Sequence, residues 1–237
     1  MTFLGRILLC ALVAAPLLPA ADQLTGFPFQ NETLRYRVLW PGARALGDVT
    51  MTAHQAGEGG WDFEMTANVN IPVVPLADKY SASAATFDLC SNTLSREISH
   101  GNKKVSEKTQ FDQKKNTALR QTLVPAGGGR TELQLPTCAR DALTYQYFAR
   151  REMGQGRVPP AGKVFFGSAY EVKPVYTGAM DIQVAGKPTT TDHVEVSVKG
   201  PASDFTFEIF YARDAARTPL LIKIPVPVGT VSLELVR

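Results

Sequence analysis

The sequence predicts a mainly β protein: a strongly curved antiparallel meander, forming an open or incomplete barrel, with one central α-helix packed in its concave side. Three observations support this. Apolar and polar residues alternate with a period of two in many short stretches. Turn-forming clusters such as "AGEGG" (56–60) and "KGPAS" (199–203) separate these stretches, with no helix between them. Only "RDALTYQYFARREMG" (140–154) has the pattern of a good helix.

The chain begins with a stretch typical of secretory signal peptides. Arg6 precedes an apolar run over residues 7–18, and small residues follow. The run is too short for a membrane span, which needs about 18 or more apolar residues. We therefore predict that residues 1–21 are removed. The rest of the chain, residues 22–237, is expected to be exported to the periplasm or beyond as a soluble protein that does not span the membrane.

The mature chain has the size of one large β domain, with a seam around residues 125–160, where proline and glycine cluster about the helix. The whole chain has 25 basic and 22 acidic side chains. That balance gives no reason to expect a nucleic-acid partner. The oligomeric state is left open by the sequence.

Before the helix, alternation is clearest in three stretches, at residues 33–40, 48–53 and 62–69. In the first of them Leu34, Tyr36 and Val38 share one face, and polar residues occupy the other. One apolar face and one polar face are typical of antiparallel strands with one buried side.

After the helix, the same alternation appears at residues 193–199 and 230–235, where Val194, Val196 and Val198 share a face. Together with weaker stretches, we expect about a dozen strands. A twisted sheet of that width curls or splits, so a curved or incompletely closed sheet is predicted.

Two cysteines, Cys90 and Cys138, remain after the signal peptide with Cys10 is removed. An even number of cysteines in an exported chain predicts a disulfide. A redox or catalytic thiol is the alternative, and it is less favoured because no histidine lies nearby in the sequence to activate one.

The predicted helix is apolar on several sides. Asp141 suits its start and Gly154 suits the position just after its end. Leu143 and Tyr147 lie on one face, Phe148 lies on another, and the remaining apolar face consists of Ala142, Tyr145, Ala149 and Met153. A helix that is apolar on several sides is held on several sides. We therefore expect a concave sheet to wrap it, with an ordinary helix on the outer face of the sheet as the alternative.

Arg150 falls between these faces, and a gripped helix would bury it, so its guanidinium needs an acceptor. One interpretation is an anion or ligand clamp inside a cavity. The other, which we prefer, is a salt bridge or carbonyl contact that pins the helix to the sheet.

No catalytic or metal-binding residues are predicted, and no cofactor. His54, His100 and His193 are isolated, without a second ligand at metal spacing. The stretch "FFGSAY" around Ser168 lacks the second glycine of a nucleophile elbow. No pair of carboxylates stands out as an acid–base couple.

Two apolar stretches do not alternate: "NIPVVPLADKY" (70–80) and "LLIKIPVPVG" (220–229). Their prolines argue against central positions in a sheet. They could line the mouth of a cavity or cover a sheet edge, and covering an edge is the preferred interpretation.

The stretch "CARDALTYQYFAR" resembles a signature of exported bacterial proteins grouped as domain-of-unknown-function family 3108 (DUF3108). "NETLRYRVLWPGARALGDVTM" is similar to the family's opening hairpin and "FYARDAARTPLLIKIPVPVGTVSLEL" to its last hairpin. The residues that carry the resemblance are Gly47, Asp141, Ala142, Leu143, Tyr147, Phe148, Arg150, Asp214, Pro219 and Gly229. It covers residues 29–237. It implies an envelope protein of mostly β structure and implies no reaction.

The function we expect is non-catalytic binding of a lipid or other hydrophobic molecule, because a curved sheet around a helix leaves an apolar hollow. Tyr145, Tyr147, Phe148 and Arg150 are the candidates for lining it. The alternative is a structural or interaction protein of the envelope without a small-molecule ligand. A hydrolase ranks last.

Overall fold

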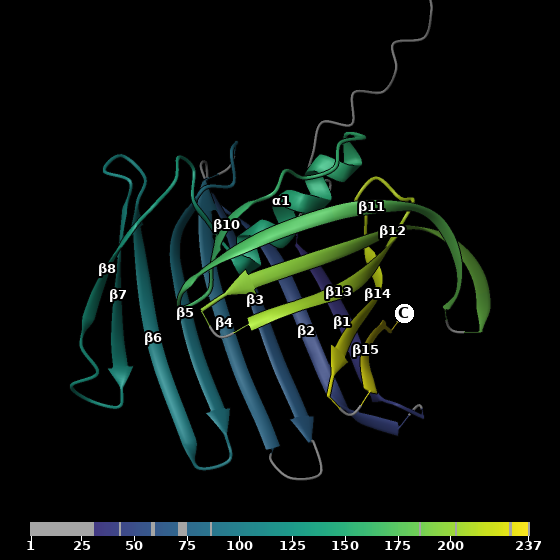
Figure 1. Ribbon diagram of the computed structural model, residues 1–237, viewed down its shortest axis with the longest axis horizontal. Coiled ribbons are helices and arrows are strands. Elements are labelled where there is room, and N and C mark those ends of the chain that lie inside the picture. The colour runs from purple at the N-terminus through teal and green to yellow at the C-terminus, as the bar shows by residue number, and fades with distance from the viewer. Residues whose placement is uncertain are drawn as a thin grey trace, which may run out of the picture.

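The computed structural model describes residues 31–42, 44–57, 60–70, 75–85, 87–184, 186–201, 203–227 and 229–236 (Figure 1). The predicted signal peptide, residues 1–21, lies outside the described residues.

The described residues form one 15-stranded sheet and one α-helix, so the prediction of a mainly β protein with a single helix is confirmed. In chain order the elements are β1 (Glu32–Trp40), β2 (Arg44–Ala56), β3 (Gly60–Asn70), β4 (Pro75–Ala85), β5 (Ser91–His100), β6 (Lys103–Asp112), β7 (Thr117–Val124), β8 (Arg130–Gln134), β9 (Arg140–Asp141), α1 (Ala142–Gly154), β10 (Gly162–Phe165), β11 (Ala169–Val184), β12 (Lys187–Gly200), β13 (Ser203–Ala212), β14 (Pro219–Val226) and β15 (Gly229–Leu235).

The strand order is β8-β7-β6-β5-β4-β3-β2-β1-β15-β14-β13-β12-β11-β10-β9. The chain thus makes two meanders. The first consists of β1–β8 and the second of β10–β15, and β1 pairs with β15 to join them, with Tyr36 opposite Leu235. The pairs are antiparallel except for β9 and β10, which are parallel. The sheet is curved and does not close into a barrel.

The sheet instead curls so far that its edge strand, β9, comes close to β5, a strand inside the same sheet. The amide of Ser91, which opens β5, donates to the carbonyl of Ala139 next to β9, at 3.0 Å. The Gln113 side chain spans the same junction, donating to the Ser91 and Ala139 carbonyls at 2.6 and 3.0 Å. Cys90 and Cys138 form a disulfide beside it, with Cα atoms 4.8 Å apart, as predicted.

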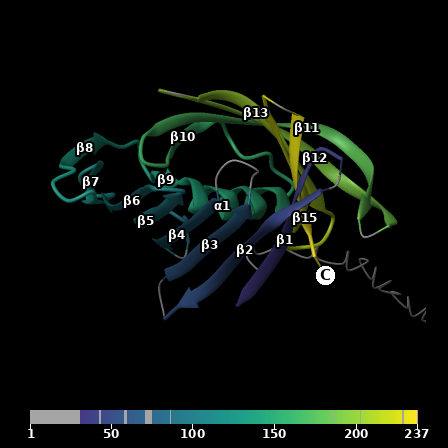
Figure 2. The ribbon, with the colours of Figure 1, turned by 90° about the horizontal axis from the view of Figure 1, so that it is seen from below.

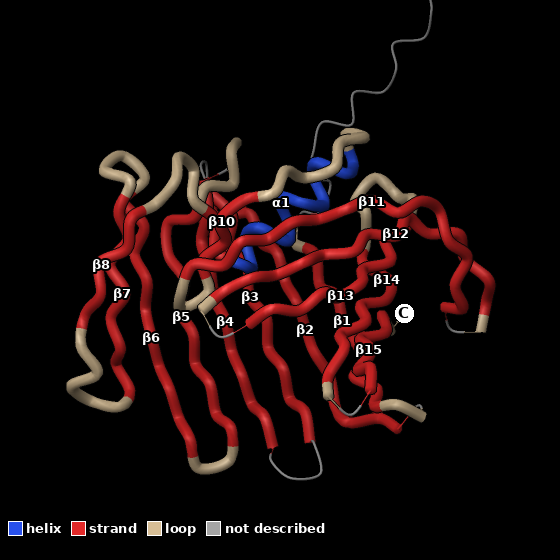
Figure 3. Tube along the Cα trace, in the orientation of Figure 1, coloured by secondary structure: helices blue, strands red, loops and turns tan. Residues whose placement is uncertain are grey.

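Helix α1 lies in the concave side of this curled sheet (Figures 2 and 3), between β2–β5 and β10–β13. Its N-cap is Asp141, whose Oδ1 accepts from the amides of Leu143 and Thr144 at 2.9 and 3.0 Å. The prediction for Gly154 is wrong by two residues: Gly154 is the last residue of the helix, Gln155 is its C-cap, and Gly156, with a φ of 74°, takes the following position. A Cβ on Gly154 would lie 3.1 Å from the carbonyl oxygen of Ala215, which explains a glycine inside the helix.

The helix is held from two directions, as its patterning predicts. Leu143, Tyr147 and Phe148 belong to a core cluster with β3, β4 and β5. Met153 belongs to a second cluster with β11–β14. Tyr147 is 0% exposed and Phe148 is 7% exposed. Burial on both sides fixes the helix inside the sheet, and an outer-face location is excluded.

The preferred interpretation of residues 220–229, as an edge cover, is wrong. Most of them form β14, which pairs with both β13 and β15 in mid-sheet. Pro219 is the first residue of the strand, a position where proline is tolerated. Pro225 lies in the part of β14 that pairs with β15 alone, because the pairing with β13 ends at Lys223. In the other stretch, residues 75–80 begin β4; residues 71–74 lie outside the described residues.

Candidate ligand-binding cavity

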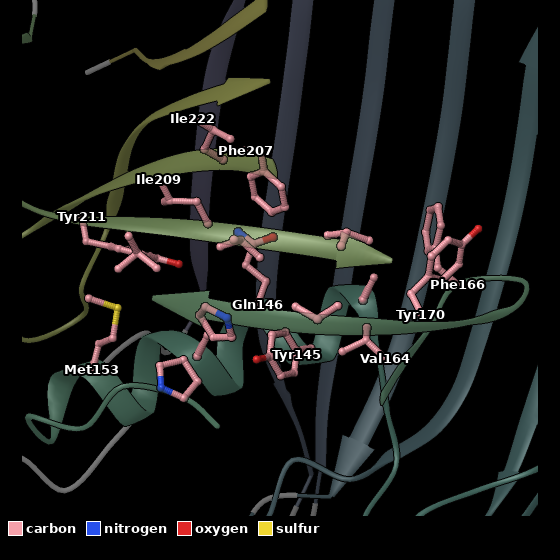
Figure 4. Close-up of a pocket in the computed structure, with 18 of the residues that line it drawn as sticks. Tyr145, Gln146, Met153, Val164, Phe166, Tyr170, Phe207, Ile209, Tyr211 and Ile222 are labelled. Carbon is pink, nitrogen blue, oxygen red and sulfur yellow. The ribbon is translucent and has the colours of Figure 1, made fainter. Parts of the chain in front are cut away.

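A cavity of about 450 Å³ separates α1 from the concave face of the second meander (Figure 4). One wall is the helix, and the opposite wall is formed by β10–β14. The lining side chains are Ala142, Tyr145, Gln146, Ala149, Met153, Pro159, Val164, Phe166, Tyr170, Val172, Pro174, Val194, Val196, Val198, Phe205, Phe207, Ile209, Tyr211 and Ile222.

The helical wall follows from the period of the helix. Positions three or four residues apart share a face, so one apolar face of α1 turns toward the cavity while the other two pack into the first meander. That face is the one singled out from the sequence: Ala142, Tyr145, Ala149 and Met153.

The sheet wall follows from the two-residue period of strands. The valines of β12 that share a face in the sequence, Val194, Val196 and Val198, all border the cavity. Every second residue of the neighbouring β13, from Phe205 to Tyr211, does the same. The two strands are paired in register, with Val196 opposite Phe207, so their side chains form a continuous apolar surface.

The polar groups of the lining are few and uncharged. The Tyr145 hydroxyl donates to the carbonyl of Pro160 at 3.2 Å, and burial raises the pKa of Tyr145 to about 12. Burial also raises the pKa of Tyr211, which is 2% exposed. Gln146 projects from α1 into the cavity (Figure 4), and its Nε2 lies 3.3 Å from the Sδ of Met51. These phenols stay neutral at physiological pH, so the cavity presents no charge through its lining.

A second cavity, of about 630 Å³, lies against the first one at Phe207 and Ile222, which line both. Its other lining residues are Val38, Trp40, Leu46, Val49, Met51, Met65, Val69, Leu76, Ile224, Val226, Pro227, Val231 and Leu233. Both non-alternating apolar stretches contribute to it, through Leu76 and through Ile224, Val226 and Pro227. The cavity-mouth interpretation of these stretches therefore describes their location better than edge covering does.

Of the aromatic residues predicted to line a cavity, the structure places Tyr145 there and turns the other two elsewhere. Tyr147 stacks on Phe63 of β3, with ring centroids 4.2 Å apart. Phe148 lies under the guanidinium of Arg140, whose Cζ is 3.7 Å from the ring centroid. Both rings fill the core between α1 and the first meander.

Arg150, the fourth predicted residue, faces the first strand rather than the cavity. It is 0% exposed. Its Nη1 and Nη2 each lie 2.7 Å from a carboxylate oxygen of Glu32, and its Nε donates to the carbonyl of Ala216 at 3.1 Å. This geometry matches the preferred interpretation, a contact that pins the helix to the sheet.

Sequence reasoning missed most of the sheet wall. The stretch "DFTFEIFYA" (204–212) alternates Phe205, Phe207 and Ile209 with polar residues, and Tyr211 continues the same face after Phe210. That alternation predicts an apolar face, although its position opposite the Ala142–Met153 face of the helix depends on the strand order. Gln146 carried a weaker signal, as an amide between two apolar faces of a buried helix.

The three histidines lie on different strands and do not line the first cavity. They are on β2, β5 and β12. His100 contacts Asp78 at 3.0 Å, and the buried His193 lies 2.5 Å from the Thr177 hydroxyl. The described part of the chain contains no helix with the length and apolar character that a membrane span requires.

Comparison with solved structures supports the fold. A beta-barrel-like protein of domain of unknown function DUF1849 from Brucella abortus is similar, with a TM-score of 0.57 and 10% identity over 86% of this chain and 95% of that chain. The hypothetical protein CT021 from Chlamydia trachomatis aligns with a TM-score of 0.36 and 12% identity over 90% and 87% of the two chains, too weakly to support an argument. A search of curated proteins gave no match.

A family model confirms the resemblance carried by the helix and the two hairpins. The model described as "Protein of unknown function (DUF3108)" matches residues 35–236, from β1 to the residue after β15. The match includes α1 and all the cavity-lining residues given above. The chain therefore belongs to the DUF3108 family.

Proposed function

We propose that this protein is an exported, non-catalytic binding protein that holds a lipid or another hydrophobic molecule between α1 and the sheet. The observation that carries the proposal is the cavity of about 450 Å³ with its almost wholly apolar lining. Small-molecule sites have volumes of about 300–1,000 Å³ and are lined mostly by apolar and aromatic side chains. An apolar ligand gains free energy by covering this surface, in proportion to the area removed from water.

The proposed location outside the cytoplasm is supported by the disulfide between Cys90 and Cys138. Disulfides persist in oxidising compartments and are rare where glutathione keeps thiols reduced. The signal-like residues 1–21 point the same way. Cell fractionation and N-terminal sequencing of the mature protein test this part of the proposal.

The proposed function is non-catalytic because of the side chains that line the cavity. Apart from Gln146 and three tyrosines, the side chains that border the first cavity are apolar. General acid–base catalysis needs a group that titrates near the working pH within reach of the substrate. Burial holds the pKa of Tyr145 and of Tyr211 well above neutrality, which suits binding rather than proton transfer.

A fluorescent hydrocarbon tests the proposal. Diphenylhexatriene gains fluorescence when an apolar cavity shields it from water, so titrating it into the purified protein reports an affinity. Val196, which borders the cavity, is changed to Trp to obstruct the site. Val175 is on the neighbouring strand, 42% exposed and outside the lining, so Val175→Trp adds the same atoms elsewhere.

We expect wild type and Val175→Trp to bind the probe alike, and Val196→Trp to bind it about tenfold more weakly, a loss of about 1.4 kcal/mol. Equal binding by all three proteins, or none by wild type, contradicts the proposal. The second outcome favours the alternative function, a structural or interaction protein of the envelope.

A further inference from the structure

Resting on the proposed function, we propose that the two cavities form one site for a single neutral acyl lipid. The Gln146 amide, at their junction, binds the ester or amide group of that lipid.

The two cavities meet at specific side chains. Phe207 and Ile222 line both, so the two cavities adjoin at β13 and β14. Gln146 lines the first cavity, and its amide contacts Met51, which lines the second. A polar group at this point is flanked by apolar surface in two directions, as the ester of a long-chain lipid is flanked by its chains.

The Gln146 amide is poorly satisfied by the protein. Among the hydrogen bonds between described residues, its one partner is the Met51 sulfur, at 3.3 Å. A thioether is a weak acceptor, and the amide oxygen and second N–H can still bind. Tyr211 adds a hydroxyl on the sheet wall, and the described residues offer it no hydrogen bond. Gln146 is half-buried and faces the cavity, so a polar ligand group can take the place of water at its amide.

The lack of charged side chains in the site limits the kinds of ligand that it can bind. Neither cavity is lined by an acidic or basic side chain. The buried cation nearest in sequence to Gln146, Arg150, is engaged by both carboxylate oxygens of Glu32. A carboxylate or phosphate placed at Gln146 would lose its hydration without gaining a counter-charge, which is strongly unfavourable. The part of the ligand inside the site is therefore neutral, which favours esters and amides over free fatty acids.

Competition against bound diphenylhexatriene tests this with three probes: tetradecane, methyl dodecanoate and dodecanoate. The first two have chains of equal length, and the third carries a charge at neutral pH. The variants are Gln146→Leu and Tyr211→Phe, with Gln183→Leu as a matched control, because Gln183 is an exposed residue of β11 outside both cavities. Circular dichroism and thermal unfolding confirm that each variant is folded.

We expect Gln146→Leu to bind methyl dodecanoate about fivefold more weakly relative to tetradecane than wild type does, the usual effect of one neutral hydrogen bond. Tyr211→Phe should shift the same ratio in the same direction, and Gln183→Leu should leave it unchanged. Dodecanoate should compete less well than its methyl ester at pH 7 and improve as the pH falls through its own pKa.

Two results overturn the inference while leaving the proposed function intact. One is an ester-to-hydrocarbon ratio that is the same in wild type, Gln146→Leu and Tyr211→Phe. The other is tighter binding of dodecanoate than of its ester at pH 7. If wild type binds neither diphenylhexatriene nor any competitor, the proposed function itself fails, and the inference fails with it.

Discussion

Arg150 of the central helix and Glu32 of the first strand form a buried bidentate ion pair, with Nη1–Oε2 and Nη2–Oε1 distances of 2.7 Å. The Nε of Arg150 donates to the carbonyl oxygens of Ala216 and Arg217, in the turn between β13 and β14. One guanidinium thus joins α1 to both meanders. Burial alone would lower the pKa of Arg150, but the hydrogen bonds and the charge of Glu32 outweigh it and raise the pKa.

Replacing Arg150 by Met should destabilise the protein severely, because it leaves the Glu32 carboxylate almost buried without its partner. Removing one partner of a buried pair costs about 3–5 kcal/mol of unfolding free energy. Urea unfolding followed by circular dichroism measures this. The double variant Glu32→Leu/Arg150→Met should recover part of the loss. Lys79→Met serves as the control, because the side chains of Lys79 and its partner Glu64 are 47% and 41% exposed. Equal stability of Arg150→Met and wild type would show that the pair does not anchor the helix.

Removing the side chain of Asp141 should loosen the start of the helix. Its carboxylate accepts from two helix amides and from the hydroxyls of Ser91 and Thr144, at 2.5 and 2.7 Å. Asp141→Ala leaves these buried donors unpaired, and we expect a loss of about 3 kcal/mol. Asp214→Ala is a matched control, since that carboxylate also accepts from an amide and a threonine hydroxyl but lies in an exposed turn. A larger loss for Asp214→Ala than for Asp141→Ala would contradict this account.

The disulfide should contribute substantially to stability. Cys90 and Cys138 are 48 residues apart in the sequence, and closing a loop of that length restricts the unfolded chain by about 4 kcal/mol. We expect Cys90→Ser/Cys138→Ser to unfold at clearly lower urea concentration than wild type. Reduced wild-type protein provides the control, because it should match the double variant. If oxidised wild type, reduced wild type and the variant have the same urea midpoint, the bridge has no stabilising role.

Alkaline pH should unfold the protein as buried tyrosines ionise. Burial raises the pKa of Tyr145 to about 12, and raises the pKa of Tyr36, Tyr147 and Tyr211 further. In the unfolded chain the tyrosine pKa is about 10. The stability from these neutral phenols is therefore fully present below about pH 10 and lost as the pH rises through the folded-state values.

Absorbance at 295 nm, which reports tyrosinate, should therefore include a step for the buried tyrosines that coincides with the loss of circular dichroism above about pH 12. Tyr147→Phe should remove one tyrosine from that step. Ionisation of all tyrosines near pH 10, in protein that keeps its β-sheet signal, would show that these rings are open to solvent.

Local patterns predicted the elements well. Alternation at residues 33–40 placed Leu34, Tyr36 and Val38 on one face of a strand, and all three are buried in β1. The apolar pattern of residues 142–153 predicted a helix held on more than one side, and the two core clusters confirm it. Patterns of this kind succeed because a strand or a helix turns its side chains with a fixed period.

Long-range partners were beyond the sequence pattern. Glu32 lies 118 residues before Arg150, and nothing local to either residue indicates the contact. The pairing of β1 with β15, which brings the two meanders into one sheet, has no local signal either. The sheet has 15 strands and not about a dozen, because it includes short strands such as the two-residue β9. The pairing of such a short strand depends on how the sheet curls.

The candidate site was predicted in part, for the same reason. Periodicity identified both the helical face with Tyr145 and the strand face of Val194–Val198, and each lines the cavity. That the two faces oppose each other depends on the strand order. Tyr147, Phe148 and Arg150 were predicted to line the cavity as well, but their side chains turn toward the first meander.

Native mass spectrometry of the protein isolated from its own cells, without detergent, tests the central claim most directly. Wild type should carry a bound molecule that organic solvent releases, and so should Val175→Trp. Val196→Trp, isolated in the same way and equally folded, should carry little or none. Wild-type protein found only at its ligand-free mass in repeated preparations, or an adduct that Val196→Trp retains in full, would contradict binding between α1 and the sheet.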